Sequence, residues 1–175
     1  MSITALIAKV AEAEPLVGDL RLRFDETALL GVPAHITVLA PFMAPHIVDN
    51  AVLARLRAVL ARVSPFEFAL SRLGRWPEVT YLAPEPARPL VELTRAVFEA
   101  FPEFPPYQGQ HAEIVPHLTV SFGTTANAGL AEAELRPRLQ ARGPIRSKCT
   151  ELALLENSSG IWKQLHVLPL ATNDA

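Results

Sequence analysis

Cysteine is almost absent from this sequence, with only Cys149 among 175 residues. A lone cysteine cannot close an internal disulfide, which is typical of proteins that stay in a reducing compartment. Hydrophobic runs long enough to cross a membrane are also missing, and the chain does not open with a charged segment followed by an apolar one. We therefore expect a cytoplasmic protein that makes no membrane contact, and we expect Cys149 to be a small core residue rather than a nucleophile.

A surplus of basic residues is missing too. The chain carries 16 Lys and Arg against 18 Asp and Glu, a formal net charge of −2. A protein that holds long nucleic acid through many phosphates needs a clear basic surplus. This composition argues against that class and restricts any nucleotide or RNA-end partner to one local pocket. Hydrophobic residues make up 50% of the chain, which is enough to bury a core without disulfides. We also expect the protein to be a monomer.

A histidine–threonine motif occurs twice in the sequence. Residues 32–38 read Val-Pro-Ala-His-Ile-Thr-Val, and residues 115–120 read Val-Pro-His-Leu-Thr-Val. The β-branched residues and the flanking prolines indicate a short strand in each case. A single motif of this kind is commonplace on a strand with a polar outer face. Two copies separated by almost half the chain indicate two structurally similar halves.

Each motif places its histidine and its threonine on one face of the strand. Side chains alternate along a strand, so His35 and Thr37 point away from the apolar core, as do His117 and Thr119. Two imidazoles facing one cleft can act as general base and general acid on a phosphoryl group, with ring nitrogens roughly 5–8 Å apart. The threonine hydroxyls can donate hydrogen bonds to phosphoryl oxygens. Which histidine would be the base stays open.

The remaining pattern predicts an α+β fold in which each half repeats a strand, a helix and a hairpin. We interpret residues 1–175 as one bilobal domain with pseudo-two-fold symmetry and a central cleft, its lobes divided between the two motifs. The sixteen prolines favour short elements. Strands are expected at 3–10, 20–24, 36–38, 66–70, 79–83, 117–122, 145–147 or 150–155, and 161–170, helices at 50–62, 89–101 and 126–141, a loop at 12–18 and a turn at 72–77.

The paired motifs resemble those of the 2H phosphoesterase superfamily, the 2′,5′-RNA ligase-like proteins, over about residues 3–170. The resemblance implies hydrolysis, rather than ligation, of a 2′,3′-cyclic phosphate or a 2′,5′-phosphodiester in a nucleotide or RNA end, without metal or cofactor. It implies that His35 and His117 are the catalytic acid–base pair. It also implies that Thr37 and Thr119 bind the substrate phosphate.

Other substrate contacts are less well defined. Some RNA-processing relatives carry an arginine shortly after the second motif, where this sequence has Ser121-Phe122-Gly123. Arg21, Arg23 and Arg75 are therefore candidates for neutralising the phosphate, although Arg21 and Arg23 also fit a solvated strand edge. Further candidate contacts are Phe42, Tyr107, His111 and Trp162, and three aromatic residues, Trp76, Tyr81 and Trp162, fit either base stacking or core packing.

Three other interpretations stay open. The first is a binding module that holds a nucleotide or phosphate in the same cleft without chemistry. The second is a metal site in which His46 or His111 joins the two motif histidines, although close ligand groupings are lacking and the threonines would then have no purpose. The third is a purely structural interaction domain. Turnover of a 2′,3′-cyclic nucleotide that is insensitive to chelators would dispose of all three.

Overall fold

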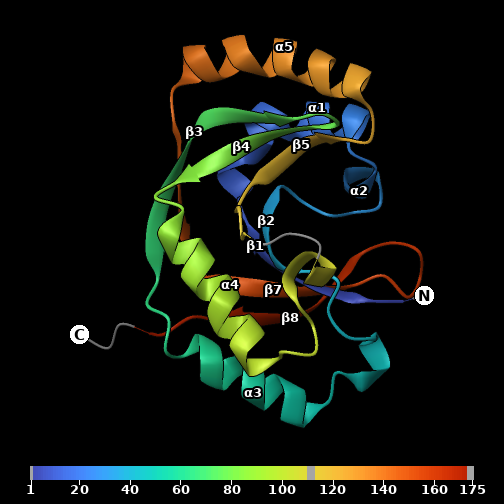
Figure 1. Ribbon diagram of the computed structural model, residues 1–175, viewed down its shortest axis with the longest axis vertical. Helices are drawn as coiled ribbons and strands as arrows, with labels where there is room; N and C mark the ends of the chain where they lie inside the picture. The colour runs from blue at the N-terminus through green and yellow to red at the C-terminus, as the bar shows by residue number, and fades with distance from the viewer. Residues whose placement is uncertain (1, 110–112, 173–175) are drawn as a thin grey trace.

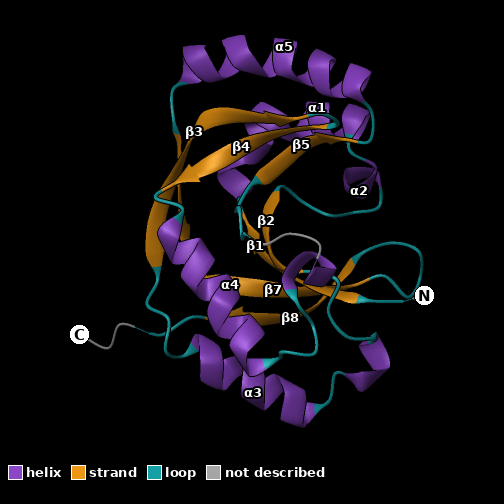
Figure 2. Ribbon diagram, viewed as in Figure 1, coloured by secondary structure: helices purple, strands orange, loops and turns teal. Residues whose placement is uncertain are grey.

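Two four-stranded antiparallel sheets form the centre of the protein in a computed structural model that describes residues 2–109 and 113–172 (Figures 1 and 2). The first sheet has the order β2-β1-β7-β8 and the second β5-β4-β3-β6. The strands are β1 (Thr4–Lys9), β2 (His35–Leu39), β3 (Phe66–Trp76), β4 (Val79–Glu85), β5 (Leu118–Phe122), β6 (Ile145–Cys149), β7 (Glu151–Glu156) and β8 (Lys163–Pro169). The α-helices are α1 (Glu14–Phe24), α2 (Glu26–Leu29), α3 (Asn50–Leu60), α4 (Arg88–Ala100) and α5 (Thr125–Arg142).

Helices cover each sheet in pairs. α5, at the top of Figure 1, packs with α1 on the second sheet, whereas α3 and α4 contact each other and pack on the first. The order β1-α1-β2-α3 recurs as β4-α4-β5-α5. The helix between the two strands of each unit packs on the other unit, because α1 contacts β5 and α4 contacts β2. The expected α+β fold with two similar halves is confirmed, and the halves interlock.

The segment between β1 and β2 differs from expectation. The predicted loop at 12–18 and the predicted strand at 20–24 are both wrong, because α1 occupies residues 14–24. Pro15 lies in its first turn, where the helix needs no backbone donor from it. Arg21 and Arg23 therefore lie on nearly opposite sides of a helix rather than on one face of a strand. The predicted repeat units began at the motif strands β2 and β5. The observed units begin earlier, with β1 and α1 in the first half and with β4 and α4 in the second.

Most other elements match the predictions, with two changes. The predicted turn at 72–77 is wrong, because β3 continues through it and pairs with β4 as far as Trp76. The alternative strands at 145–147 and 150–155 both exist, as β6 and β7. The Asp49 side chain caps α3 and accepts a hydrogen bond from the Val52 amide. β7 and β8 form the expected hairpin.

One hydrophobic cluster joins the two halves and fixes the motif strands. The residues between and beyond each histidine and threonine, Ile36 and Val38 in β2 and Leu118 and Val120 in β5, are essentially inaccessible and belong to this cluster. Burying each of these four aliphatic side chains stabilises the fold by about 1.5–3 kcal/mol relative to exposure. Because side chains alternate along a strand, this burial keeps the motif histidines and threonines on the opposite face. Cys149 is buried in the same cluster, as expected. No helix in the described part of the chain is long and apolar enough to span a membrane.

A β-bulge follows the threonine in both motif strands. In β2 the register with β1 shifts after Thr37, and Val38 is the extra residue. In β5 the register with β4 shifts after Thr119, and Val120 is the extra residue. In both strands the two residues after the threonine are therefore buried. A bulge increases the local twist and redirects side chains, and here the distortion occurs at equivalent positions of the two halves.

Candidate functional site

The two motif strands meet where the sheets adjoin. β2 is the edge strand of the first sheet, β5 is the edge strand of the second, and the two lie against each other. His35 begins β2, and His117 immediately precedes β5. The structure thus brings both histidine–threonine pairs to one junction, although their residues are far apart in the sequence.

Both histidines make the same hydrogen bond. Nδ1 of His35 lies 2.8 Å from the Pro33 carbonyl oxygen, and Nδ1 of His117 lies 2.7 Å from the Val115 carbonyl oxygen. A carbonyl oxygen only accepts, so each Nδ1 carries the proton and donates it. In the neutral ring, Nε2 is then the acceptor nitrogen. Each imidazole is held in the tautomer that a general base requires at Nε2.

Helix α1 fixes the segment that leads into His35. The Arg21 guanidinium donates to the Val32 carbonyl oxygen (3.0 Å) and to the Asp25 carboxylate (2.9 Å), and this ion pair is almost completely buried. The Glu14 carboxylate accepts a hydrogen bond from the Ala34 amide at 2.6 Å. Because the backbone is held on both sides of Pro33, the carbonyl that orients His35 has a defined position.

Burial changes the proton affinity of His35. The ring keeps only partial contact with solvent, and removal of water from the imidazolium lowers the pKa of His35 from 6.5 to about 4. The hydrogen bond to the Pro33 carbonyl raises this pKa, whereas the positive charges of Arg21 and His117 lower it. His35 is therefore neutral at physiological pH. The influence of His117 on His35 also indicates that the two rings share one electrostatic environment.

The motif threonines have unused hydroxyl groups. Thr37 and Thr119 are both half-buried, on the face opposite the core. Neither hydroxyl has a hydrogen-bond partner among the residues that the structure describes. A hydroxyl held on a strand beside an imidazole can donate to a phosphoryl oxygen without first breaking a bond within the protein.

His117 lies among aromatic rings at the edge of a hollow of about 770 Å³. Its ring centroid is 4.8 Å from that of Trp76, 5.5 Å from that of Tyr81 and 6.4 Å from that of Tyr107. The backbone at Tyr107 and at the next residue, Gln108, has φ angles of 53° and 56°, which are costly for residues other than glycine. The lining of the hollow consists of Trp76, Pro77, Val79, Tyr107, Glu113, Val115, His117, Thr119 and Phe122.

A glycine in β3 makes room for one of these rings. The Tyr81 ring lies directly over Gly74, its partner across the β3–β4 pair, and a Cβ at Gly74 would overlap the ring. Tyr81 also stacks on Trp76 with ring centroids 4.4 Å apart. The glycine therefore allows Tyr81 to lie flat on the sheet, where its edge reaches His117.

The three candidate arginines are committed to structural contacts. Arg21 is 2% exposed, and its guanidinium group donates to Asp25 and to the Val32 carbonyl oxygen. It would have to break these hydrogen bonds to contact a substrate. Arg23 pairs with Glu134 on α5, on the helix-covered side of the second sheet. Arg75 pairs with Glu132 of α5 and donates to nearby backbone carbonyls. A contact from any of these arginines to a substrate phosphate stays a prediction, and it would require the arginine to leave the partners described here.

The candidate aromatic contacts fall into different environments. Phe42 is a core residue rather than a contact, because it is 4% exposed and packs edge-on against Phe101 and Phe104. Tyr107 lines the hollow beside His117. Trp162 packs on a small apolar cluster of the first sheet, on the face that carries Thr37. His111 lies outside the described residues.

Sequence reasoning missed Phe122 and Glu113 as lining residues of the hollow. Simple alternation from His117 places Phe122 on the core side, but the bulge after Thr119 returns it to the open face, where it is 65% exposed. A bulge leaves no clear trace in a sequence of this kind. Lys9 was also missed: it pairs directly with His35 across β1 and β2 and donates to Gln164 at 2.8 Å.

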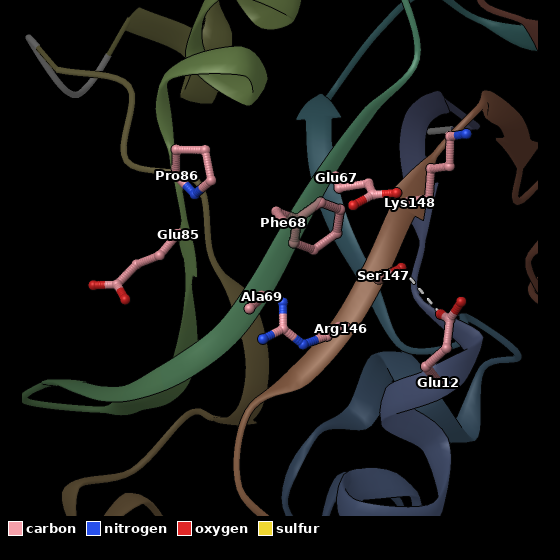
Figure 3. Close-up of a pocket in the computed structure, with 9 residues that line it drawn as sticks. All are labelled: Glu12, Glu67, Phe68, Ala69, Glu85, Pro86, Arg146, Ser147 and Lys148. Carbon is pink, nitrogen blue, oxygen red and sulfur yellow. Dashed lines mark hydrogen bonds between the residues drawn. The ribbon is translucent and has the colours of Figure 1, made fainter.

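A second hollow, of about 500 Å³, lies away from the motifs and is drawn in Figure 3. Acidic and basic side chains alternate around it, with Glu67 and Lys148 on neighbouring strands and Ser147 bonded to Glu12. No histidine is among its described lining residues, so it lacks the histidine–threonine arrangement of the two motifs. Among residues 2–109 and 113–172, no group of three or more His, Cys, Asp or Glu side chains is placed to hold a metal ion.

Comparison with known proteins gives this arrangement a family. The profile of the 2′-5′ RNA ligase superfamily matches residues 9–160. A Bacillus cytotoxicus protein named as a candidate phosphoesterase is 31% identical over 102 residues, 58% of this chain and 58% of that protein. The match thus spans somewhat more than half the length of this curated relative.

Solved structures share the fold at low sequence identity. E. coli LigT complexed with 3′-AMP superposes with a TM-score of 0.61 at 17% identity, over 98% of this chain and 99% of LigT. The protein TT0787 of Thermus thermophilus gives 0.63 at 16% identity, with 98% and 99% coverage. The fold and the paired motifs define a two-sheet α+β protein of the 2H type. The chain belongs to the 2′-5′ RNA ligase superfamily.

Proposed function

We propose that the protein is a phosphodiesterase that hydrolyses a 2′,3′-cyclic phosphate, or a 2′,5′-phosphodiester, of a nucleotide or RNA end. One observation carries the proposal: two histidines on adjoining strands each donate Nδ1–H to the backbone two residues earlier, and each is followed by a half-buried threonine whose hydroxyl has no partner in the described protein. Such duplication suits a reaction that needs one proton acceptor and one proton donor. A metal ion is not required for that exchange.

The reaction proceeds by transfer of two protons around phosphorus. Nε2 of one histidine accepts a proton from water as the water oxygen bonds to phosphorus. The bond from phosphorus to one ribose oxygen breaks, and that oxygen takes a proton from Nε2 of the other histidine. Thr37 and Thr119 donate to the non-bridging oxygens as their negative charge grows. The product is a ribose phosphomonoester with a free neighbouring hydroxyl.

The environments of the histidines distinguish their roles. His35 is more deeply enclosed, and its lowered pKa keeps it neutral, so we assign it as the base that activates water. The role of acid then falls to His117. Because kcat/KM reports ionisations of the free enzyme, its acid limb is expected near pH 4 rather than near 6.5. A bound phosphate anion favours protonation, so the acid limb of kcat is expected at higher pH.

The nucleotide class of substrate is supported by the relatives. Solved LigT structures contain 3′-AMP, NADP+ or ATP. At the low identity to LigT these ligands identify no particular substrate here. They are consistent with a site for phosphate joined to ribose and base.

A substrate screen tests the proposal. The purified protein is incubated with nucleoside 2′,3′-cyclic phosphates and with 2′,5′-linked dinucleotides, and the His35→Gln/His117→Gln double variant provides the blank. We expect product from at least one of these compounds with the wild-type protein, unaffected by chelator, and none with the double variant. Protection against thermal unfolding without any product would instead identify a binding module and overturn the catalytic proposal.

A further inference from the structure

The hollow beside His117 is apolar on nearly every side. Aromatic and aliphatic side chains form most of its lining, and Phe122 and Val115 leave 65% and 40% of their surfaces exposed there. Exposed apolar groups grouped beside reactive ones usually mark a ligand site. At about 770 Å³ the hollow has room for a nucleobase and its ribose.

The same hollow is poor in positive charge. Among the lining residues that the structure describes there is no lysine or arginine, and the ionisable groups are His117, Tyr107 and the carboxylate of Glu113. Arg75 is next to Trp76 in the chain, but its guanidinium is bonded to Glu132 and to the Thr125 carbonyl oxygen. A second phosphate placed beyond His117 would meet a carboxylate and apolar rings, and no lysine or arginine among the described lining residues.

One histidine–threonine pair belongs to this apolar surface. His117 and Thr119 belong to the lining, so a phosphate held by them is continuous with whatever fills the hollow. A flat ring between Trp76 and Phe122 would cover apolar area that is otherwise left in water, and stacking on aromatic side chains tolerates any base. The geometry therefore suits a ligand with one phosphate at the threonines and one base on the aromatic rings.

We infer that this hollow holds the nucleobase of a nucleotide that carries a single phosphate group, and that it discriminates against nucleotides that carry a second phosphate on the 5′ oxygen. The inference rests on the proposed function for the position of the first phosphate. It goes further by assigning the base-binding side chains and by restricting the substrate class. The competing location for the base is the surface beside Trp162, on the face of the first sheet that carries Thr37.

Equilibrium binding tests the inference without requiring turnover. Isothermal titration calorimetry compares adenosine 3′-monophosphate with adenosine 3′,5′-bisphosphate and with inorganic phosphate. We expect the bisphosphate to bind at least about 10-fold more weakly than the monophosphate. In the inferred pose His117 serves the first phosphate, and the second phosphate meets the Glu113 carboxylate without a lysine or arginine to neutralise it. Inorganic phosphate should bind more weakly than the monophosphate, because it lacks the base.

Variants locate the base. Phe122→Ala removes an exposed side chain and should weaken monophosphate binding at least about 5-fold without changing the affinity for inorganic phosphate. Trp76→Leu should weaken monophosphate binding about 10-fold. Leu130→Ala, on exposed α5 surface, is the matched apolar control and should change neither affinity. Glu113→Gln should strengthen bisphosphate binding about 3-fold and leave monophosphate binding within about 2-fold.

Two results would overturn the inference: bisphosphate binding as tight as that of the monophosphate, or weakening by Trp162→Leu while Phe122→Ala has no effect. Phe122 is mostly exposed, so this variant tests the site even if Trp76→Leu fails to fold. Binding of the expected pattern without any hydrolysis would contradict the proposed function alone. Hydrolysis without discrimination between the two nucleotides would contradict only this inference.

Discussion

At the scale of single residues, His35 couples the site to the stability of the fold. Its pKa is about 4 in the folded protein and about 6.5 when unfolded, so the unfolded chain binds more protons between these values. The stabilising contribution of the neutral ring is complete above pH 6.5 and is lost as pH falls toward 4. With partial exposure taken into account, we expect a loss on the order of 1–2 kcal/mol between pH 6.5 and 5.

Urea unfolding at both pH values measures this loss. Carboxylates with lowered pKa, such as Glu132 and Glu134, add to acid sensitivity mainly below about pH 4.5, outside the measured window. His35→Gln should therefore remove most of the change between pH 6.5 and 5. His46→Gln, at an exposed histidine, should preserve it. An equal pH dependence in the wild-type protein and His35→Gln would mean that His35 is not the group responsible.

The threonine hydroxyls provide a second test at this scale. Thr37→Val and Thr119→Val keep the side-chain shape and the β-branching but remove one donor each. Loss of a transition-state donor costs about 3 kcal/mol, so each variant should lower kcat by about 100-fold. The measurement is kcat on the substrate found in the screen, alongside the thermal midpoint as a control for folding. A wild-type kcat in either variant would exclude that threonine from the reaction.

Sequence reasoning identified the histidines and threonines because their types repeat at fixed spacing. It made Arg21 one of three candidates for the phosphate, because a guanidinium group can match an oxyanion with two donors. Only the fold reveals that Arg21 bonds to Asp25 and Val32. Phe42 was likewise a candidate contact because of its place in the sequence. An aromatic residue next to a motif can face either side of the chain, and the contacts with Phe101 and Phe104 come from a distant helix and the loop after it.

At the scale of elements, the bulge after each threonine gives the motif strands their shape. The following two residues in each strand are buried, whereas the threonine remains on the open face. The first half places Leu39 at the second of these positions, and the second half places Ser121, whose buried hydroxyl has no partner in the described structure. Both strands thus have the same bulge although the residues at this position differ in chemistry. What the two bulges have in common is their position directly after the threonine.

The β3–β4 hairpin supports His117 through Tyr81, and Gly74 tests that support. In Gly74→Ala the new methyl group would overlap the Tyr81 ring, so the ring must move. Its displacement should disturb both Trp76 and His117, and we expect a fall in kcat of about 10-fold or more with a smaller effect on folding stability. Steady-state kinetics and thermal unfolding measure the two effects.

Two substitutions clarify the Gly74 result. Tyr81→Leu in the Gly74→Ala background relieves the overlap and should recover stability without restoring kcat. Gly129→Ala, where an added Cβ meets no atom closer than 3.8 Å, is the matched glycine control. Unchanged kcat in Gly74→Ala would show that Tyr81 does not position His117.

Helix α1 was not predicted from the sequence, which indicated a loop and a strand in its place. Gly18 within it weakens helix propensity, and the leucine–arginine alternation near its end resembles a strand. Its stability comes from packing on β5 and from ion pairs with α5, such as that between Arg138 and Asp19. Local patterns cannot predict such a tertiary contribution. The helices α3, α4 and α5 were predictable from local signals: side-chain caps at the start of α3 and α5, and a proline in the first turn of α4 with apolar residues at helical spacing.

At the scale of the whole molecule, the candidate site lies between two similar halves, and the helix of each half packs on a strand of the other. Each half contributes one histidine and one threonine, and each half sends a helix to cover the strand of the other. The repeat of the motif predicted two similar halves. The sequence did not reveal that β2 and β5 would be sheet edges that meet, because that depends on β7 pairing with β1 and β3 pairing with β4.

The central claim is that His35 and His117 act as one acid–base pair on one phosphate. It is tested most directly by single-turnover rates of the wild-type protein, His35→Gln, His117→Gln and the double variant on one 2′,3′-cyclic nucleotide. Groups that act as a unit are strongly non-additive. We predict that each single variant loses about 10²–10⁴-fold in rate and that the double variant loses scarcely more than either. A wild-type rate in either single variant, or losses that multiply in the double variant, would contradict the account.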